Sequence, residues 1–382
     1  MESFGCWYKK IIEDGNLPRD CSSSQEETPQ TPDFDVHVNF WFLNDILKQK
    51  VKKPYLDIGI KIGDYRELLN VVFSFPFQLT KENIVDLAPM MSTKGNASLV
   101  FNEECEIETK NEYTIVQIPK DEKDNDKLLI FSLKQAVEDV FELTDYEDRS
   151  YITIKFDTFR KYLKTNVELD AYPSLYIRFR LKGVDLHNVL YFDSEPFNKS
   201  LDSAFSGTRI FDFKINEKRN INKNIAARMD IQGETLAEFN QVHFLVMEPS
   251  SYDMVSYSQN QMTCRELEKD LWDEYLKVEL NDNAGHILAY HWKKKAKDSN
   301  HKISDFSCFA KINYQKMQIK TVLAYVLVVL GLGVIGSTIV SATPLLNSYF
   351  KWQIGQYVLP NFTIDVIIGL GMIGVGWLCG RK

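Results

Sequence analysis

Two unlike hydrophobic patterns divide this chain. Between residues 34 and 292, short runs of apolar residues alternate with polar ones, as expected for strands whose two faces meet different surroundings. The clearest runs are 56–62 and 175–181. After residue 320 the pattern changes to long apolar stretches, which are typical of membrane-spanning helices. The sequence therefore predicts a mainly β (α+β) body followed by a C-terminal two-helix transmembrane hairpin.

The strand pattern of the body recurs about 120 residues further along the chain, which suggests an internal duplication. We therefore predict two tandem β-sandwich-like units, at 34–145 and 146–292. The alternative is a coincidence, because β-rich chains often produce such matches. A helix is predicted at 263–278, where apolar residues line one face. Residues 1–33 include a polar run rich in Ser, Gln and Pro and are expected to form a flexible leader.

The C-terminal part has the length and composition of two membrane spans. Residues 321–342 carry no charge, and a helix of that length spans roughly 33 Å, against a hydrocarbon core of about 30 Å. Residues 362–380 form the second predicted span, and the aromatic-rich segment 343–361 is the predicted extracytoplasmic loop. The alternative is one buried core helix followed by a hydrophobic terminus. A core helix, however, rarely runs so long without a polar face.

Charge placement predicts the orientation. Residues 293–320 hold eight lysines against two aspartates and form a basic juxtamembrane neck. Arg381 and Lys382 follow the second span, whereas the loop holds only Lys351. By the positive-inside rule, the N-terminal domain and the C-terminus are expected in the cytoplasm. Because the whole chain has a net charge of −8, the body must be strongly acidic, which argues against a broad polyanion-binding surface.

No enzyme signature is present in the sequence. It lacks a P-loop, an HExxH motif, a GxSxG motif and a glycine-rich dinucleotide loop. The six cysteines form no CxxC pair, and the six histidines are scattered along the chain. We therefore expect no catalytic residue, no metal site and no cofactor.

Two groups of basic residues are candidates for binding phosphate. One group shares a face of the strand at 175–181, and the other lies between residues 209 and 219. Guanidinium groups on a rigid strand suit phosphate oxygens, so these groups could hold a nucleotide or a short oligonucleotide. The alternative is a solvated or edge-strand face, or pairing with acidic residues elsewhere. The predicted ligand-binding residues are Arg178, Arg180, Lys182, Arg209, Lys214, Lys218 and Arg219.

Each predicted span carries one face of mostly small residues. Such faces let helices approach closely in lipid, so the spans are expected to pack with copies of themselves. A ring of Asp365 side chains in an oligomer would favour cations; alternatively, Asp365 lies at the interface and marks the helix start. The predicted pore or helix-packing residues are Gly333, Ser337 and Ser341 in the first span and Asp365, Gly369, Met372 and Gly376 in the second.

A large soluble sensor followed by a short bundle of spans resembles the membrane effectors of bacterial anti-phage systems. In these a nucleotide or oligonucleotide, made by a partner nucleotidyltransferase, controls a transmembrane module. Within that group the layout is similar to the channel subunits of Hailong systems, whose control ligand is an oligodeoxyadenylate. The resemblance is one of architecture and carries over no residue.

The resemblance implies a homo-oligomeric, ligand-controlled channel or pore-forming effector in the bacterial inner membrane, because two spans cannot enclose a pore alone. Its expected partners are membrane lipid, other copies of the chain, the nucleotide ligand and the nucleotidyltransferase. The alternative is a membrane-anchored adaptor or scaffold, whose hairpin only tethers a protein-binding module.

Overall fold

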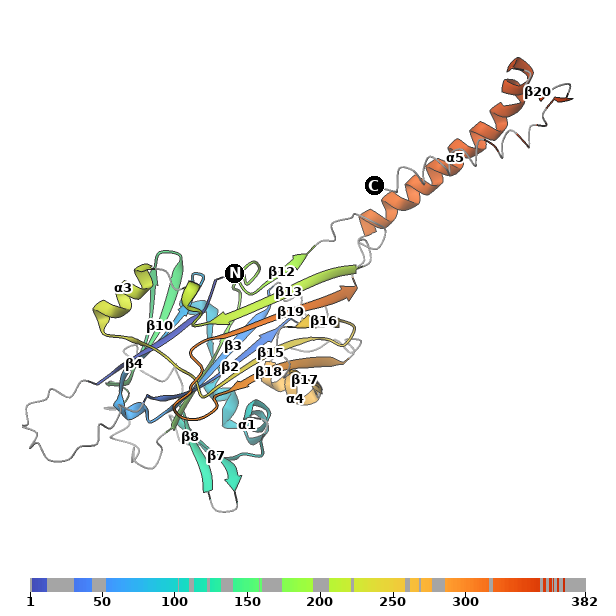
Figure 1. Cartoon of the computed structure of the whole chain (residues 1–382). Helices are drawn as coiled ribbons and strands as arrows, with labels where there is room; N and C mark the ends of the chain where they lie inside the picture. Colours follow the sequence, from blue (N-terminus) through green and yellow to red (C-terminus); the bar gives the residue numbers. More distant parts are fainter. Residues whose placement is uncertain are drawn as a thin grey trace, which may run out of the picture. The chain divides into compact units, whose positions relative to one another are not determined.

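The computed structural model describes most of the chain (Figure 1). The described residues are 2–11, 31–42, 53–101, 103–109, 113–121, 124–131, 140–157, 159, 174–194, 206–220, 223–257, 262–267, 269–276, 286–315, 319–350, 353–354, 357–358, 360, 363 and 367. The chain divides into two compact units. The first comprises Met1–Glu195 with Gly207–Tyr314, and the second comprises Pro196–Ser206 with Gln315–Lys382.

The first unit is built on a ten-stranded sheet, so the predicted mainly β body is confirmed. Most neighbouring strands are antiparallel, but β2 pairs with β15 and β8 with β11 in parallel. The strand order is β17 (Met262–Leu267), β18 (Ile287–Lys295), β15 (Gln241–Pro249), β2 (Asp33–Trp41), β3 (Tyr55–Gly63), β11 (Ser174–Leu181), β8 (Asp124–Phe131), β7 (Tyr113–Asp121) and β6 (Glu106–Thr109), with β5 (Ile84–Asp86) also paired to β11.

Two smaller sheets complete the β structure of this unit (Figure 1). A five-stranded sheet has the order β14 (Thr235–Leu236), β1 (Gly5–Lys10), β4 (Leu68–Phe75), β10 (Arg149–Lys155) and β9 (Phe141–Tyr146). A four-stranded sheet has the order β12 (Tyr191–Ser194), β13 (Ser206–Ile215), β19 (Phe306–Gln315) and β16 (Asp253–Tyr257).

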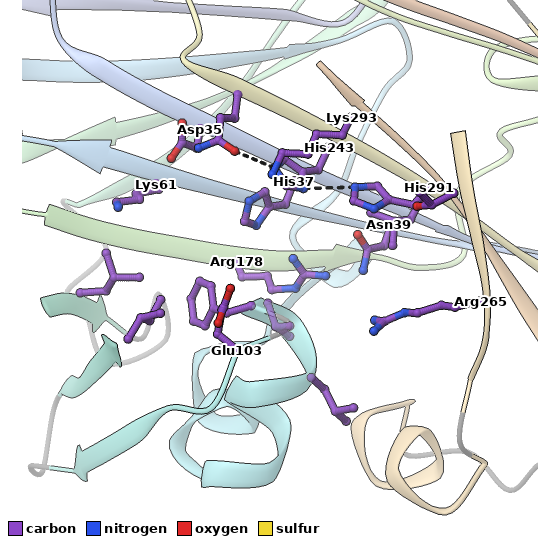
Figure 2. Close-up of a pocket in the computed structure, with 18 of the residues that line it drawn as sticks. Asp35, His37, Asn39, Lys61, Glu103, Arg178, His243, Arg265, His291 and Lys293 are labelled. Atoms are coloured by element: carbon purple, nitrogen blue, oxygen red, sulfur yellow. Dashed lines mark hydrogen bonds between the residues drawn. The ribbon is translucent and has the colours of Figure 1, made fainter. Parts of the chain in front are cut away.

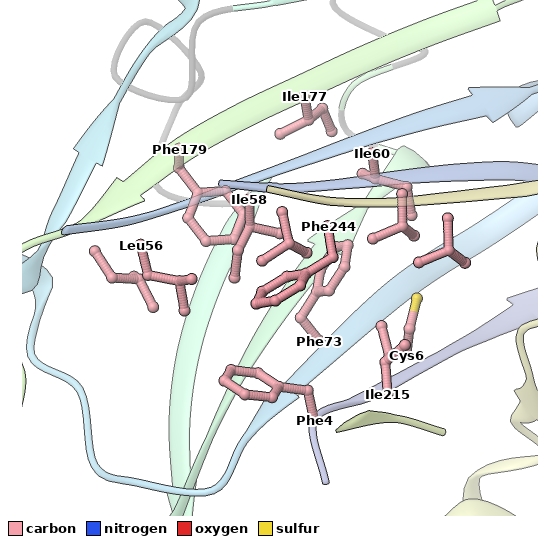
Figure 3. Close-up of a cluster of buried hydrophobic side chains, with 14 of the residues drawn as sticks. Phe4, Cys6, Leu56, Ile58, Ile60, Phe73, Ile177, Phe179, Ile215 and Phe244 are labelled. Carbon is pink, nitrogen blue, oxygen red and sulfur yellow. The ribbon is translucent and has the colours of Figure 1, made fainter. Parts of the chain in front are cut away.

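The main hydrophobic core joins apolar faces of the three sheets (Figure 3). Ile58 and Phe179 come from the ten-stranded sheet, and Phe73 comes from the five-stranded one. Phe213 of β13 stacks on Phe244 of β15, with ring centroids 4.6 Å apart. Because side chains alternate along a strand, burying one face of β2, β3, β11 and β15 in this core leaves their polar residues on the opposite face.

The predicted division into two tandem units is wrong. β11, from the second predicted unit, pairs with β3 of the first along eight residues, and β15 pairs with β2. The strands that neighbour the two supposed repeat strands also differ. β2 lies beside β3 in the ten-stranded sheet, whereas its supposed counterpart β10 lies in the five-stranded sheet, away from β11. Similar alternation thus reflects a shared core-facing role and not a duplication.

Three predicted boundaries also need correction. The expected helix at 263–278 begins with β17, which pairs with β18, and only α4 (Lys269–Leu276) is helical among its described residues. The expected leader contains β1, because Cys6, Trp7 and Tyr8 are buried there in the five-stranded sheet. The expected neck contains the end of β18 and all of β19, so much of it belongs to the β body.

The first unit also contains short helices between its strands. Two of them, α1 (Lys94–Phe101) and α4, contact each other and cover the polar face of the ten-stranded sheet. The remaining described helices are α3 (Lys223–Gln232) and the 3-10 helices Tyr65–Glu67, Lys81–Asn83, Ala88–Ser92 and Lys218–Asn220.

Among its described residues the second unit has one long apolar helix, α5 (Ile319–Phe350), followed by the short strands β20 (Gln353–Ile354) and β21 (Tyr357–Val358). Its segment Val329–Tyr349 has the length and hydropathy needed to cross a membrane. The helix continues through Pro344, so the predicted loop at 343–361 begins too early. Of the second predicted span, 362–380, the structure describes only residues 363 and 367. Asp365, Gly369, Met372 and Gly376 lie outside the described residues.

Candidate ligand-binding site

A cavity of about 540 Å³ lies on the polar face of the ten-stranded sheet (Figure 2). Its floor is formed by residues of β2, β3, β11, β15 and β18. Leu99 and Phe101 of α1 and Trp272 of α4 contribute apolar walls. A cavity of this size and mixed lining is typical of a site for a small ligand.

Three histidines from three neighbouring strands form a row across this floor (Figure 2). His37 of β2 is directly opposite His243 of β15, and His291 of β18 follows on the next strand. The ring centroids are 4.7 Å apart for His37 and His243, and 5.1 Å apart for His243 and His291. The His243 and His291 rings are stacked, whereas the His37 ring is tilted by 59° from that of His243. The sheet register thus brings three imidazoles together, which we call the histidine row.

The histidine row is bound by neutral hydrogen-bond partners. His243 Nδ1 lies 3.2 Å from His291 Nε2, so one nitrogen donates and the other accepts. His37 Nδ1 lies 3.1 Å from the Tyr176 hydroxyl, and His243 Nε2 lies 3.3 Å from Oε1 of Gln241. Among the described residues no carboxylate hydrogen-bonds to any of the three rings.

Burial keeps the histidine row uncharged at neutral pH. Burial, with the neighbouring His243 and Arg178 as further causes, lowers the pKa of His37 well below its usual 6.5. Burial and His291 lower the pKa of His243 to about 3. Burial and Lys293 lower the pKa of His291 to about 4. A proton on any of these rings would therefore have to be compensated by an added negative charge.

Cations outnumber carboxylates around the cavity. Four cationic and two acidic residues line it: Lys61, Arg178, Arg265 and Lys293 against Asp35 and Glu103. Lys61 is paired with Asp126. Lys293 is exposed and makes no ion pair among the described residues. Burial raises the pKa of the Asp35 carboxyl, which disfavours its negatively charged form. With neutral histidines the cavity is net positive, which favours an anionic ligand.

Arg178 is held rigidly at the base of the cavity. Its Nε donates to the Tyr275 hydroxyl at 2.8 Å, and Nη1 donates to the Tyr176 hydroxyl at 3.0 Å. The Asn39 side-chain oxygen, in its favoured amide orientation, accepts from Nη2 at 2.8 Å. Gly59 makes room for this arrangement, because a β-carbon there would lie 2.2 Å from the Tyr176 hydroxyl oxygen.

Arg180 has a structural role in the described fold. It is buried, and its Nε and Nη2 donate to the two carboxylate oxygens of Asp57 at 2.6 and 2.9 Å. Its Nη1 donates to the Leu276 carbonyl of α4 at 3.3 Å. The strand does place Arg178 and Arg180 on one face, as predicted, but α4 covers that face, so it is not a solvated cationic stripe.

The structure does not bring the other predicted basic residues to the cavity. Lys182 is exposed beyond the end of β11. Arg209 is buried in the four-stranded sheet, where it pairs with Asp193 at 2.9 Å and its guanidinium lies 3.5 Å from the Phe42 ring centroid. Lys214 pairs with Asp212. Lys218 and Arg219 are exposed, and Arg219 pairs with Glu217. Of the seven predicted residues, only Arg178 lines the cavity.

The small residues predicted on the first span share an exposed face of α5. Gly333, Ser337 and Ser341 are exposed, and no described atom outside the local helix backbone and the chain neighbours lies within 4 Å of a β-carbon built at Gly333. The Ser341 hydroxyl donates to the Ser337 carbonyl at 2.9 Å, so it is satisfied within the helix. This bonding is compatible with a lipid or helix–helix environment.

Sequence reasoning missed the histidine row because its members lie far apart in the chain. Residues 37, 243 and 291 converge only through strand pairing. A weak signal existed, since His37 and His243 occupy the polar phase of alternating strands whose other phase is apolar. No cluster of three or more His, Cys, Asp or Glu residues suited to a metal ion is found within the described part of the chain.

Comparison with known proteins adds no functional assignment. No protein-family model matches the chain, and no curated protein matches it. One solved structure with a weak likeness is the Fcho1 Mu homology domain of Danio rerio with a bound Eps15 peptide. The two are 7% identical over 75% of this chain and 79% of that chain, with a TM-score of 0.14, which is too low to support an argument.

Proposed function

We propose that this chain is a ligand-controlled membrane channel whose β-rich unit binds a nucleotide or oligonucleotide. The observation that carries the proposal is the net-positive cavity above the histidine row. Its cations suit phosphate oxygens, and Phe101, Trp272 and the imidazole rings offer flat surfaces for a base. The cavity volume fits one nucleotide, so a longer oligonucleotide would place only one of its units inside.

The membrane part of the proposal rests on α5. Its apolar segment Val329–Tyr349 is long enough to span lipid, and its small-residue face offers a surface for close helix packing. We propose that residues 362–380 return through the membrane, which would place the N-terminal unit and the C-terminus in the cytoplasm of a bacterial cell. Copies of the hairpin would then surround a pore lined by Asp365.

The channel proposal is tested by ion flux through liposomes that contain the purified full-length chain. Adenosine 5′-monophosphate and oligodeoxyadenylates are added on the side of the β-rich unit. A ligand-dependent change of flux, in either direction, supports the proposal. Lys293→Ala should weaken this response because Lys293 lines the cavity. Lys297→Ala is the matched control, since it removes the same charge from an exposed lysine outside the cavity lining.

The competing function is a membrane-anchored adaptor whose α5 only tethers the β-rich unit. It predicts that liposomes containing the chain conduct no ions, with or without nucleotide, even when the chain is fully inserted. It also predicts that Gly333→Leu leaves function unchanged, whereas a packed oligomeric channel should lose flux.

A further inference from the structure

We propose that the pocket takes up protons on its histidine row when it binds an anion, so that ligand binding is coupled to pH. This inference rests on the proposed ligand pocket and specifies its ligand as a dianionic group such as a phosphomonoester. The juxtaposition that carries it is a row of three neighbouring imidazoles on adjacent strands, with ring centroids 4.7 and 5.1 Å apart, beneath a cavity lined by four cations.

The hydrogen-bond partners of the histidine row are uncharged. A carboxylate that hydrogen-bonds a histidine already raises the pKa of the ring in the free protein, so a second anion raises it by less. Here the partners are a tyrosine hydroxyl, a glutamine amide and another imidazole. An anion entering the cavity would therefore be the first negative group to contact the row.

Polar and charged groups face the histidine row from every strand of the floor and from the segments packed over it. Six of them are charged, and four of these six are positive. The groups are Asp35 and Asn39 of β2, Lys61 of β3, Tyr176 and Arg178 of β11, Gln241 of β15, Arg265 of β17, Lys293 of β18, and Glu103 after α1. Asp35 is the nearest acid in sequence to His37, and burial raises its pKa, which weakens its opposition to an anion.

A bound anion favours protonation of the histidine row. In the free pocket, burial and like charges disfavour the imidazolium forms, so the row is neutral at pH 7. A bound dianion adds attraction for a proton and raises the pKa of the ring it touches. Between the free and the bound pKa, binding is accompanied by proton uptake. By linkage, affinity then rises as pH falls, by up to about tenfold per pH unit for each proton taken up.

Calorimetric titration of the full-length chain in mild detergent tests this inference. Inorganic sulfate and adenosine 5′-monophosphate are titrated at about pH 7.5 and about pH 6, each in two buffers with different ionisation enthalpies. Sulfate keeps its charge over this range, whereas the nucleotide phosphate itself gains a proton near pH 6. We expect both probes to bind more tightly at the lower pH, with buffer-dependent heats that correspond to net proton uptake.

Variants locate the proton. In His243→Asn, sulfate binding should take up fewer protons, and the affinity for sulfate should depend less on pH. If this variant folds poorly, His291→Asn gives the same test at the end of the histidine row. His301→Asn is the control, because this exposed histidine pairs with Asp298 and does not line the cavity.

Three results would overturn the inference. One is sulfate binding with equal affinity at both pH values and no buffer dependence, which would leave the ligand pocket intact. Another is proton uptake on binding of adenosine 5′-monophosphate but not of sulfate, since the proton would then be taken up by the ligand. The third is the absence of binding of either probe, which would remove the proposed anion pocket itself.

Discussion

Arg180 and Asp57 form a two-point ion pair inside the protein, across adjacent strands of the ten-stranded sheet. Burial alone would raise the pKa of the Asp57 carboxyl, but Arg180 and Arg178 hold it below its usual value. The same carboxylate accepts from the Tyr275 hydroxyl and from Trp41 Nε1, both at 2.9 Å. These bonds hold helix α4 against the sheet beside the cavity. The Tyr275 hydroxyl also accepts from Arg178 Nε, so Asp57 and Arg178 share this partner.

Removal of the Asp57 charge should destabilise the first unit strongly. Asp57→Asn leaves Arg180 buried without its counter-ion, so we expect a loss of about 3–5 kcal/mol in the free energy of unfolding. Chemical denaturation of the full-length chain in detergent measures it. Glu142→Gln is the control, because Glu142 forms a half-exposed pair with Lys155, worth about 0–1 kcal/mol. Equal losses in the two variants would contradict a structural role for the buried pair.

Gly59→Ala should damage the cavity through its floor. The added β-carbon would meet the Tyr176 hydroxyl at 2.2 Å and Arg178 Nη1 at 3.0 Å, so both side chains must move. We expect a stability loss of about 1–3 kcal/mol from overpacking, and weaker binding of anions. Gly95→Ala in α1 is the matched control, since among the described residues no atom outside its own helix backbone and chain neighbours lies within 4 Å of the added β-carbon. A Gly59→Ala protein with wild-type stability and binding would show that the arrangement of Tyr176 and Arg178 is not needed.

Acid should destabilise the first unit through the histidine row. In the unfolded chain histidine has a pKa near 6.5, whereas His243 and His291 have folded values of about 3 and about 4. Between these values the unfolded state binds more protons, so stability is lost as pH falls, by about 1.4 kcal/mol per pH unit for each histidine.

Thermal unfolding curves measured from about pH 7 to about pH 5 check this slope. His243→Asn should flatten the dependence of stability on pH by the share of one histidine, while His301→Asn should leave it unchanged. Parallel curves for wild type and His243→Asn would mean that the row is not held neutral by the fold.

The alternation of apolar residues predicted much of the sheet but little of the site. Residues 56–62 and 175–181 are strands, and their apolar phase is buried in the core, as expected. Alternation does not say which strands pair, so two strands with similar patterns suggest a repeat, whereas in the structure β3 and β11 pair directly with each other. Buried polar residues such as Arg180 were likewise indistinguishable from exposed ones until their partners were known.

Insertion of α5 into lipid can be tested on its own. Val334 is an exposed apolar residue within the segment Val329–Tyr349. An arginine near the centre of a membrane span costs about 2.5–3.5 kcal/mol, so Val334→Arg should reduce the membrane-integrated fraction measured by alkaline extraction. Val334→Leu is the control and should integrate like wild type. Extraction of the wild-type chain without detergent would contradict a membrane-spanning α5.

The position of the ligand tests the central claim most directly. Photo-crosslinking of the full-length chain with an azido-adenine nucleotide, followed by mass spectrometry, identifies the residues that surround the bound base. The pocket proposal predicts labelling of α1 around Phe101 and of α4 around Trp272, with competition by unlabelled nucleotide and loss in Lys293→Ala. Specific labelling confined to the basic segment 209–219, or no specific labelling anywhere, would contradict it.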